Sequence, residues 1–179
     1  SVFRSLEGQS VYFVPNPGNV GDAMIAAATF QFLKQYRITP LPVLPTTAER
    51  LDVIVYGGGG NLTPHYPEAA RFLQVMHRKA RRLIILPHTI CGHDKLLGDF
   101  GANVEICCRE PVSYAHVSKH CRNAKVSLTE DLALFLDVQA IRQQEPAPLW
   151  SVVRAAFDQA RQVNSSPWRQ AAPSWRSPL

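Results

Sequence analysis

Short apolar runs alternate with helical patterns through about residue 137. Continuous apolar stretches predict strands at 11–14, 53–56, 83–86, 104–108 and 125–128, with a weaker one at 41–44. Helices are expected between them at 22–36, 67–80, 93–99 and 111–121. The helix at 67–80 has the clearest pattern, because its apolar residues recur at i, i+3, i+4, i+7 and i+11 after a proline in the first turn.

The order of these elements predicts an α/β fold. Alternating strands and helices favour a Rossmann-like parallel sheet with helices on both faces. The strands are apolar throughout rather than at every second position, which is typical of strands buried on both sides. Ligands of such sheets bind beyond the carboxyl ends of the strands, so the candidate loops are 15–22, 57–65, 87–93, 109–111 and 129–131.

Composition limits the size class and the compartment. The chain has 179 residues, 46% of them hydrophobic, which is enough for one domain with a buried core. No stretch reaches the roughly 20 apolar residues of a membrane span, and the first residues carry no signal-peptide pattern. Four cysteines without CxxC spacing predict free thiols in a reducing cytoplasm.

The formal net charge of +5 is uneven, because residues 141–179 hold five Lys or Arg against two Asp or Glu. No basic run predicts nucleic-acid binding. We expect a Rossmann-like domain at 1–140, an amphipathic helix or linker at 141–162 and a poorly ordered tail at 163–179. A basic tail with tryptophans also allows peripheral contact with a membrane surface.

The loop after the first strand joins flexible backbone to a helix N-terminus, where unpaired N–H groups attract anions. It contains Asn19, Gly21 and Asp22. The sequence leaves two roles open for Asp22: capping the helix, or hydrogen-bonding or deprotonating a substrate hydroxyl. The loop is not a Walker motif, because no Gly-Lys-Ser/Thr follows.

Four consecutive glycines at 57–60 follow a buried strand and precede Asn61. Such a run lets a ligand approach the backbone closely, and a tight turn is the alternative. The dinucleotide-binding fingerprint fails, because its third glycine position is Leu62.

His88 follows an apolar strand and is a candidate acid, base or anion donor, with a hydrogen-bonded loop histidine as the alternative. Together with Cys91 and His93 it matches no strong zinc pattern. His116 and His120 lie one helical turn apart and are interpreted as surface residues. We therefore predict no metal site.

Arg109 follows the strand at 104–108 and carries a planar, always-charged fork that suits phosphate or carboxylate. The alternative is an ion pair with Glu110 or Asp131. Asp131 either caps the next helix or faces the same crevice as Arg109. Cys108 beside Arg109 is a candidate nucleophile, against which buried packing is the simpler interpretation.

Taken together, these segments resemble the polysaccharide pyruvyl transferase family, in the family's order, at 18–22, 57–61, 86–90, 108–114 and 130–134. The resemblance implies one half of a two-domain glycosyltransferase-B-type fold, with a cleft between two Rossmann-like halves. It also implies transfer of pyruvate from phosphoenolpyruvate onto a saccharide as a ketal, with release of phosphate, in the synthesis of bacterial surface polysaccharides.

The resemblance assigns roles residue by residue. Arg109 would hold the phosphoenolpyruvate anion, Asp22 would contact the acceptor or assist proton transfer, and His88 would lie nearby as the third catalytic candidate. Phosphoenolpyruvate is the donor substrate and no cofactor is implied. The acceptor saccharide is often lipid-linked, which implies a cytoplasmic protein at the inner membrane face. The substrate-binding residues would be Asn19, Gly21, Gly58, Gly59, Asn61, Glu110 and Asp131.

We expect one large departure from the family, because the residues after 137 do not resemble the start of its second domain. A truncated chain, a diverged single-domain protein and a half completed by another chain all stay open, and we expect little activity from the chain alone. Two other functions compete. One is a non-catalytic sugar- or phosphate-binding module or partner-dependent subunit, and the other is half of a sugar-nucleotide glycosyltransferase.

Overall fold

The structure is a computed structural model that describes residues 1–16, 18–41 and 48–143. Its strands are β1 (Ser10–Val14), β2 (Thr39–Pro40), β3 (Leu51–Tyr56), β4 (Gly59–Leu62), β5 (Ala80–Ile90), β6 (Val104–Cys108) and β7 (Lys125–Leu128). The α-helices are α1 (Val20–Gln35), α2 (Pro67–Lys79), α3 (Asp94–Asp99), α4 (Pro111–His120) and α5 (Val138–Gln143). Two 3₁₀ helices are η1 (Phe3–Leu6) and η2 (Leu132–Phe135).

All seven strands belong to one parallel sheet, in the order β2-β1-β3-β5-β6-β7, with β4 paired to β5. The chain leaves β1 toward β2 at one side and returns to β3 at the other side. This reversal between β1 and β3 is the place where open α/β sheets form a ligand crevice. The α/β, Rossmann-like prediction is confirmed.

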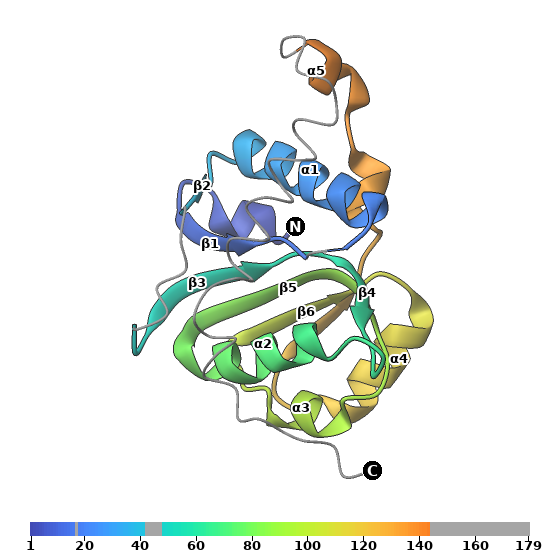
Figure 1. Cartoon of the computed structure of the whole chain (residues 1–179). Helices are drawn as coiled ribbons and strands as arrows, with labels where there is room; N and C mark the ends of the chain where they lie inside the picture. Colours follow the sequence, from blue (N-terminus) through green and yellow to red (C-terminus); the bar gives the residue numbers. More distant parts are fainter. Residues whose placement is uncertain (17, 42–47, 144–179) are drawn as a thin grey trace.

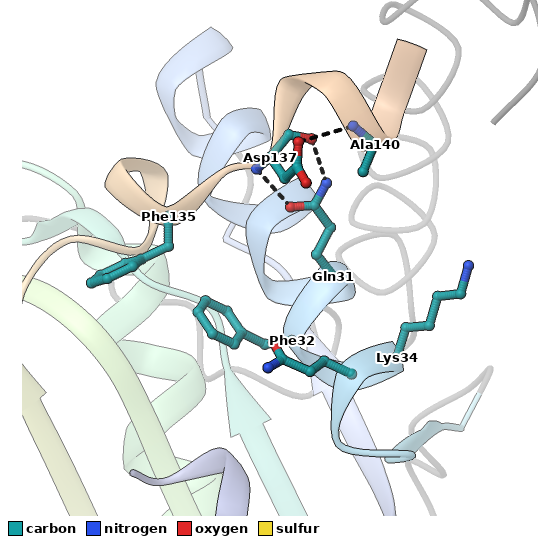
Figure 2. Close-up of a pocket in the computed structure, with 7 residues that line it drawn as sticks. Gln31, Phe32, Lys34, Phe135, Asp137 and Ala140 are labelled. Carbon is teal, nitrogen blue, oxygen red and sulfur yellow. Dashed lines mark hydrogen bonds between the residues drawn. The ribbon is translucent and has the colours of Figure 1, made fainter. Parts of the chain in front are cut away.

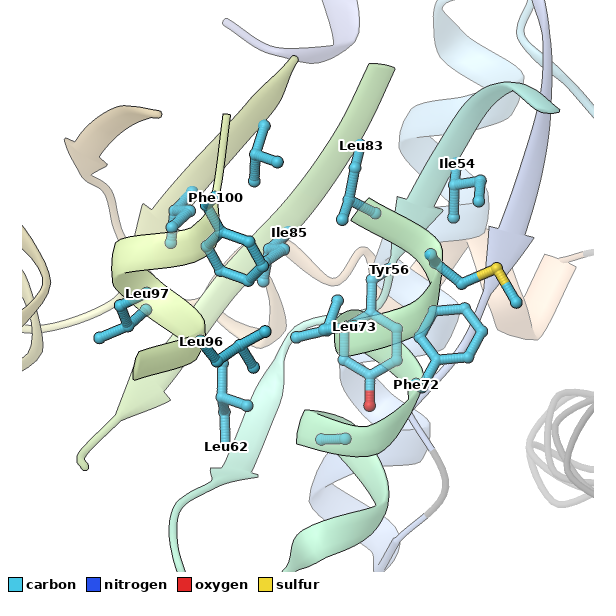
Figure 3. Packing of buried hydrophobic residues seen from close by; sticks show 14 of the residues in the cluster. Ile54, Tyr56, Leu62, Phe72, Leu73, Leu83, Ile85, Leu96, Leu97 and Phe100 are labelled. Atoms are coloured by element: carbon cyan, nitrogen blue, oxygen red, sulfur yellow. The ribbon is translucent and has the colours of Figure 1, made fainter. Parts of the chain in front are cut away.

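Helices cover both faces of the sheet, with α1 on one side and α2, α3 and α4 on the other (Figure 1). The larger core lies under α2, α3 and α4, where Tyr56 packs against Phe72, and Phe100 lies beside Ile85 (Figure 3). The second core lies under α1, η1 and η2. Burial from both sides explains the continuous apolar runs 53–56 in β3 and 83–86 in β5.

The helices begin where the sequence supplies capping groups. In α1, the Asn19 side chain accepts hydrogen bonds from the backbone N–H groups of Gly21 and Asp22. The helices α2 and α4 both start with a proline at the first position, where the missing N–H has no intrahelical partner to lose. The helix α1 begins at Val20 instead of the predicted residue 22, because Asn19 rather than Asp22 is the N-cap.

Two strands differ from the sequence prediction. The strand β5 was expected to end before Pro87 but continues to Ile90, and the run at 59–62 was expected to be a loop but forms β4 beside it. Pro87 lacks an N–H, and the strand tolerates it at an irregularity, because the β5–β6 register shifts between Ile85 and His88. The strand expected at 41–44 lies mostly outside the described residues, and the short strand β2 ends just before it, at Pro40.

The helix or linker expected at 141–162 and the tail expected at 163–179 lie outside the described residues, apart from the end of α5. Among the described residues, none of the helices has the length and apolar character needed to cross a membrane.

Candidate functional site

A pocket of about 530 Å³ lies at the carboxyl edge of the sheet. Segments that follow β1, β6 and β7 form its walls together with β4. It therefore occupies the crevice that the β1–β3 reversal predicts. The lining residues are Gly18, Asn19, Gly21, Asp22, Ile25, Gly60, Asn61, Tyr66, Arg109, Asp131 and Ala133.

Asp22 belongs to the helix start and to the pocket at once. Its Oδ2 accepts a hydrogen bond from the backbone N–H of Asn19 at 2.9 Å, and Asn19 in turn caps the helix, so the two residues form a capping box. Its Oδ1 accepts a hydrogen bond from Asn16 Nδ2 at 3.2 Å. The capping role left open by the sequence is thus present, and the carboxylate still lines the pocket.

A chain of hydrogen bonds through buried Asn16 and half-buried Asn61 supports this carboxylate. The Asn16 Oδ1 accepts hydrogen bonds from Asn61 Nδ2 at 2.7 Å and from the Tyr56 hydroxyl at 3.1 Å. The Asn61 Oδ1 lies 3.0 Å from His88 Nε2. Because the Asn61 amide already donates through Nδ2, this contact requires the proton on His88 Nε2. Every hydrogen bond of the chain then donates in the direction of Asp22.

His88 is fully buried and stacks on the ring of Tyr56, with ring centroids 5.9 Å apart. Burial, helped by the positive charge of Arg109, lowers the pKa of His88 from 6.5 to about 3. The imidazole is therefore neutral at physiological pH. It lies in β5 rather than in the loop expected from the sequence, and it reaches the pocket through Asn61.

Arg109 lies on the pocket wall and is held at two of its nitrogens. Its Nε donates to Thr89 Oγ1 at 2.7 Å, and its Nη1 donates to Asp131 Oδ2 at 2.8 Å. About a quarter of each side chain in the Arg109–Asp131 pair is exposed. Within the described part of the chain, Nη2 makes no hydrogen bond of its own. Nη2 is therefore the guanidinium nitrogen that remains available to bind a ligand.

The glycine run brings these groups together. A Cβ atom on Gly60 would lie 2.9 Å from Arg109 Nη2, and one on Gly59 would lie 2.7 Å from Asp22 Oδ1. Gly59 also has a φ of +157°, a backbone conformation that other residues rarely adopt. The absence of side chains here allows the guanidinium and the carboxylate to approach the same strand.

A second pocket, of about 500 Å³, lies between the C-terminal half of α1 and the segment from η2 to α5 (Figure 2). Gln31 exchanges hydrogen bonds with the backbone of Asp137, at 2.8 and 2.9 Å, and the rings of Phe32 and Phe135 meet edge to face. This pocket lies at the end of α1 opposite Asn19, and the Gln31 amide that lines it is already paired with the Asp137 backbone. It is therefore the weaker candidate for a catalytic site.

Comparison with known proteins identifies the family to which the chain belongs. The family model for polysaccharide pyruvyl transferase matches residues 19–173, most of the chain. The chain belongs to the polysaccharide pyruvyl transferase family. A comparison with curated proteins gave no match. Among solved structures, a functionally uncharacterised protein from Klebsiella pneumoniae subsp. pneumoniae NTUH-K2044 has the same fold, with a TM-score of 0.69 and 24% sequence identity over 90% of this chain and 74% of that one.

The pocket of this pyruvyl transferase family member brings together six of the residues singled out from the sequence, namely Asn19, Gly21, Asp22, Asn61, Arg109 and Asp131. Four others stand apart from its lining: Gly58, Gly59, His88 and Glu110. Glu110 caps α4, where its carboxylate accepts hydrogen bonds from the backbone N–H and the hydroxyl of Ser113. Gly58 packs against Pro87 and Ile25.

The sequence assigned no site role to five other residues of the pocket wall, although Gly18, Gly60 and Ala133 lie in segments that resemble the family; the five are Gly18, Ile25, Gly60, Tyr66 and Ala133. A signal for Gly60 was present, since it ends the glycine run. Asn16 was also missed, because an asparagine between two prolines looks like an ordinary turn residue. Cys108 is buried, and burial raises its pKa to about 12, so its thiol stays protonated and is a poor nucleophile.

Proposed function

We propose that this chain takes phosphoenolpyruvate as donor and builds a pyruvate ketal on a saccharide. Membership of the polysaccharide pyruvyl transferase family supports the transferase chemistry and the saccharide acceptor. The observation that carries the choice of donor is the position of Arg109, whose Nη2 meets the pocket beside Gly60. A guanidinium is the side chain best suited to a phosphate or carboxylate oxygen.

In the proposed reaction the methylene carbon of phosphoenolpyruvate takes a proton, and the central carbon becomes an oxocarbenium-like centre. One saccharide hydroxyl adds to that carbon and loses its proton. The bond from carbon to the phosphate oxygen then breaks, and inorganic phosphate leaves. A second hydroxyl of the same saccharide closes the ketal and loses its proton. Of the two hydroxyl protons, one replaces the proton taken up by the methylene carbon and the other leaves on the phosphate, so no cofactor is required.

Asp22 is the proposed acceptor of a proton from the saccharide hydroxyl, because it is a carboxylate of the pocket wall. The hydrogen bonds from Asn16 and from the backbone of Asn19 hold it in place. His88 is proposed as a positioning residue rather than the proton donor, since it is buried and acts through Asn61.

The charge balance of the pocket favours a second candidate, in which the chain binds its ligand but needs a partner to react. The pocket lining contains one guanidinium, that of Arg109, and two carboxylates, those of Asp22 and Asp131. Arg109 already donates a hydrogen bond from Nη1 to Asp131. Phosphoenolpyruvate carries a phosphate and a carboxylate, and neutralising both requires more positive charge than Arg109 alone supplies. A further domain or another chain would supply it. Half of a sugar-nucleotide glycosyltransferase is the third candidate.

The place of action follows from the donor. Phosphoenolpyruvate is a cytoplasmic metabolite, so we propose a cytoplasmic enzyme acting on an acceptor that is free or held by a lipid carrier at the inner membrane face.

The deciding experiment measures phosphate release from phosphoenolpyruvate in the presence of methyl hexopyranosides with free hydroxyls at C4 and C6. We expect Arg109→Ala to lower kcat/KM by about 100-fold, equivalent to about 2.7 kcal/mol of transition-state stabilisation. Arg81→Ala is the matched control. Arg81 is an exposed arginine at the start of β5, outside the pocket lining, where it pairs with Asp52.

A parallel titration of phosphoenolpyruvate separates the candidates. Binding that depends on Arg109, with no release of phosphate, favours the partner-dependent module. Binding and turnover that are equal in wild type and Arg109→Ala, or the absence of any binding by wild type, would overturn the proposal.

A further inference from the structure

We propose that this chain binds one divalent transition-metal ion, of the zinc class, between α3 and α4. The three ligands would be Asp94, His116 and His120. The site is separate from the pocket lined by Arg109 and Asp22, and the inference does not rest on the proposed function.

The three donor groups already converge. His116 and His120 lie one turn apart on α4, with ring centroids 4.8 Å apart. Asp94 is the first residue of α3, and its two oxygens lie 3.4 Å from His116 Nε2 and 3.7 Å from His120 Nδ1. One ligand atom from each residue lies within 4.8 Å of the ligand atoms of the other two. Among the described residues, no other group of three or more possible metal ligands meets this distance.

These separations fit a metal ion as well as an ion pair. Nitrogen and oxygen ligands lie about 2.0–2.2 Å from zinc, so neighbouring ligands of a tetrahedral ion are about 3.3–3.6 Å apart. Of the two histidine–aspartate distances, 3.4 Å lies within that range and 3.7 Å lies just above it, so small adjustments of the side chains would suffice. Two imidazoles and one carboxylate suit Zn²⁺, Co²⁺ or Ni²⁺ better than Mg²⁺ or Ca²⁺, which prefer oxygen ligands.

The backbone before α3 helps to make the cluster. Gly92 and His93 both have positive φ, of 66° and 57°, and this double bend turns the chain directly into Asp94. The Gly92 carbonyl lies 2.9 Å from His116 Nε2. That nitrogen therefore donates a hydrogen bond to the Gly92 carbonyl, and it can bind a metal only when the ring proton lies on Nδ1 instead.

The surroundings allow an ion to enter. The Asp94 side chain is 57% exposed, and the two histidine side chains are about one quarter exposed. Three protein ligands leave a coordination position for water or for a nearby oxygen such as the Gly92 carbonyl. A bound ion would fasten the start of α3 to the last turn of α4, the helix that follows Arg109.

The test is calorimetric titration of the full chain, treated with EDTA and then dialysed, with ZnCl₂. The wild type is expected to bind one equivalent of zinc, and Co²⁺ is expected to give the visible absorption of a four-coordinate ion. His116→Ala, His120→Ala and Asp94→Asn should each weaken binding by about 10-fold or more. Each variant should still fold, which far-ultraviolet circular dichroism in EDTA checks.

Three controls address other metal-binding side chains. His65→Ala removes an exposed histidine elsewhere, Asp99→Asn changes the other end of α3, and Cys91→Ser removes the exposed thiol near the cluster. These variants should bind zinc like the wild type. The proposal is overturned if the wild type does not bind, or if the His116→Ala,His120→Ala double variant binds zinc as tightly as the wild type. The Asp94→Asn variant, nearly isosteric, keeps the test valid should a histidine variant fail to fold.

Discussion

At the scale of single residues, Gly58 and Gly60 of the 57–60 run have different surroundings. A Cβ on Gly60 would meet the end of a flexible side chain, Arg109 Nη2, whereas a Cβ on Gly58 would lie 2.6 Å from the backbone carbonyl of Pro87. We expect Gly60→Ala to move Arg109 and weaken phosphoenolpyruvate binding while leaving the midpoint of thermal unfolding almost unchanged. Gly58→Ala should lower that midpoint by several degrees, since backbone of β5 must shift.

The variants Gly60→Ala and Gly58→Ala serve as controls for each other, because both add one methyl group to the same glycine run. Thermal unfolding followed by circular dichroism gives the stability, and calorimetry gives the affinity. A large loss of stability in Gly60→Ala, with affinity retained, would show that Arg109 does not depend on the bare backbone at this position.

His88 makes a second prediction at this scale, on pH. Its pKa is about 3 in the folded chain and 6.5 ordinarily, so below pH 6.5 the unfolded chain binds a proton that the folded chain does not. Stability should therefore fall as the pH falls from 6.5 toward 3, by up to about 1.4 kcal/mol per pH unit from this residue. His77, whose pKa is also lowered by burial, contributes in the same direction.

Comparison of variants isolates the part due to His88. In urea unfolding at several pH values, His88→Gln should lose much of the slope between pH 6.5 and pH 4, and His65→Gln, at an exposed histidine, is the matched control. Equal slopes in wild type and His88→Gln would mean that the buried ring takes up a proton in the folded state.

The sequence predicts single residues well where chemistry alone decides. Arg109 was singled out for its charge and Asp131 for its place after a strand, and the two meet as the ion pair that was considered. It fails for His88, whose burial depends on β4 lying alongside β5. No local pattern shows that partner, because the register of a neighbouring strand is a long-range property.

At the scale of elements, Asn19 at the start of α1 both caps the helix and lines the pocket, and variants at this residue can separate the two roles. Asn19→Ala removes the acceptor for two backbone N–H groups and should lower the free energy of unfolding by about 1 kcal/mol. Asn19→Ser should restore most of that stability, because serine is also a good N-cap. Since Asn19 lines the pocket, we expect the serine variant to keep a weaker affinity for phosphoenolpyruvate.

Urea unfolding and calorimetry on the same two variants check this. Full recovery of affinity by serine would assign Asn19 a capping role only. Stability unchanged by Asn19→Ala would mean that the capping box does not hold the helix.

Helices and the central strands were predictable because each has a local signal. Pro67 and Pro111 mark helix starts, and the apolar runs mark strands that are covered on both sides. The strand β4 was not predictable, because two glycines and an asparagine have low strand propensity. It forms because it pairs with β5, and its bare backbone at Gly60 then leaves room for Arg109.

At the scale of the whole molecule, the pocket exists only in the folded chain. Its walls come from segments far apart in the sequence, around residues 18–25, 60–66, 109 and 131–133, which the parallel sheet brings to one edge. A ligand of this pocket must therefore stabilise the entire fold, by about 2.7 kcal/mol at one hundred times its dissociation constant.

This linkage gives a prediction that discriminates among the donors. Phosphoenolpyruvate should raise the midpoint of thermal unfolding of the wild type in a concentration-dependent way and should have little effect on Arg109→Ala. The rise should shrink at high salt, because the contact is a charge pair at a partly exposed site in a molecule of net charge +5. Inorganic phosphate at equal concentration tests whether the phosphate group alone is sufficient. A rise produced by nucleotide sugars and not by phosphoenolpyruvate would contradict the pyruvyl donor and favour the glycosyltransferase alternative.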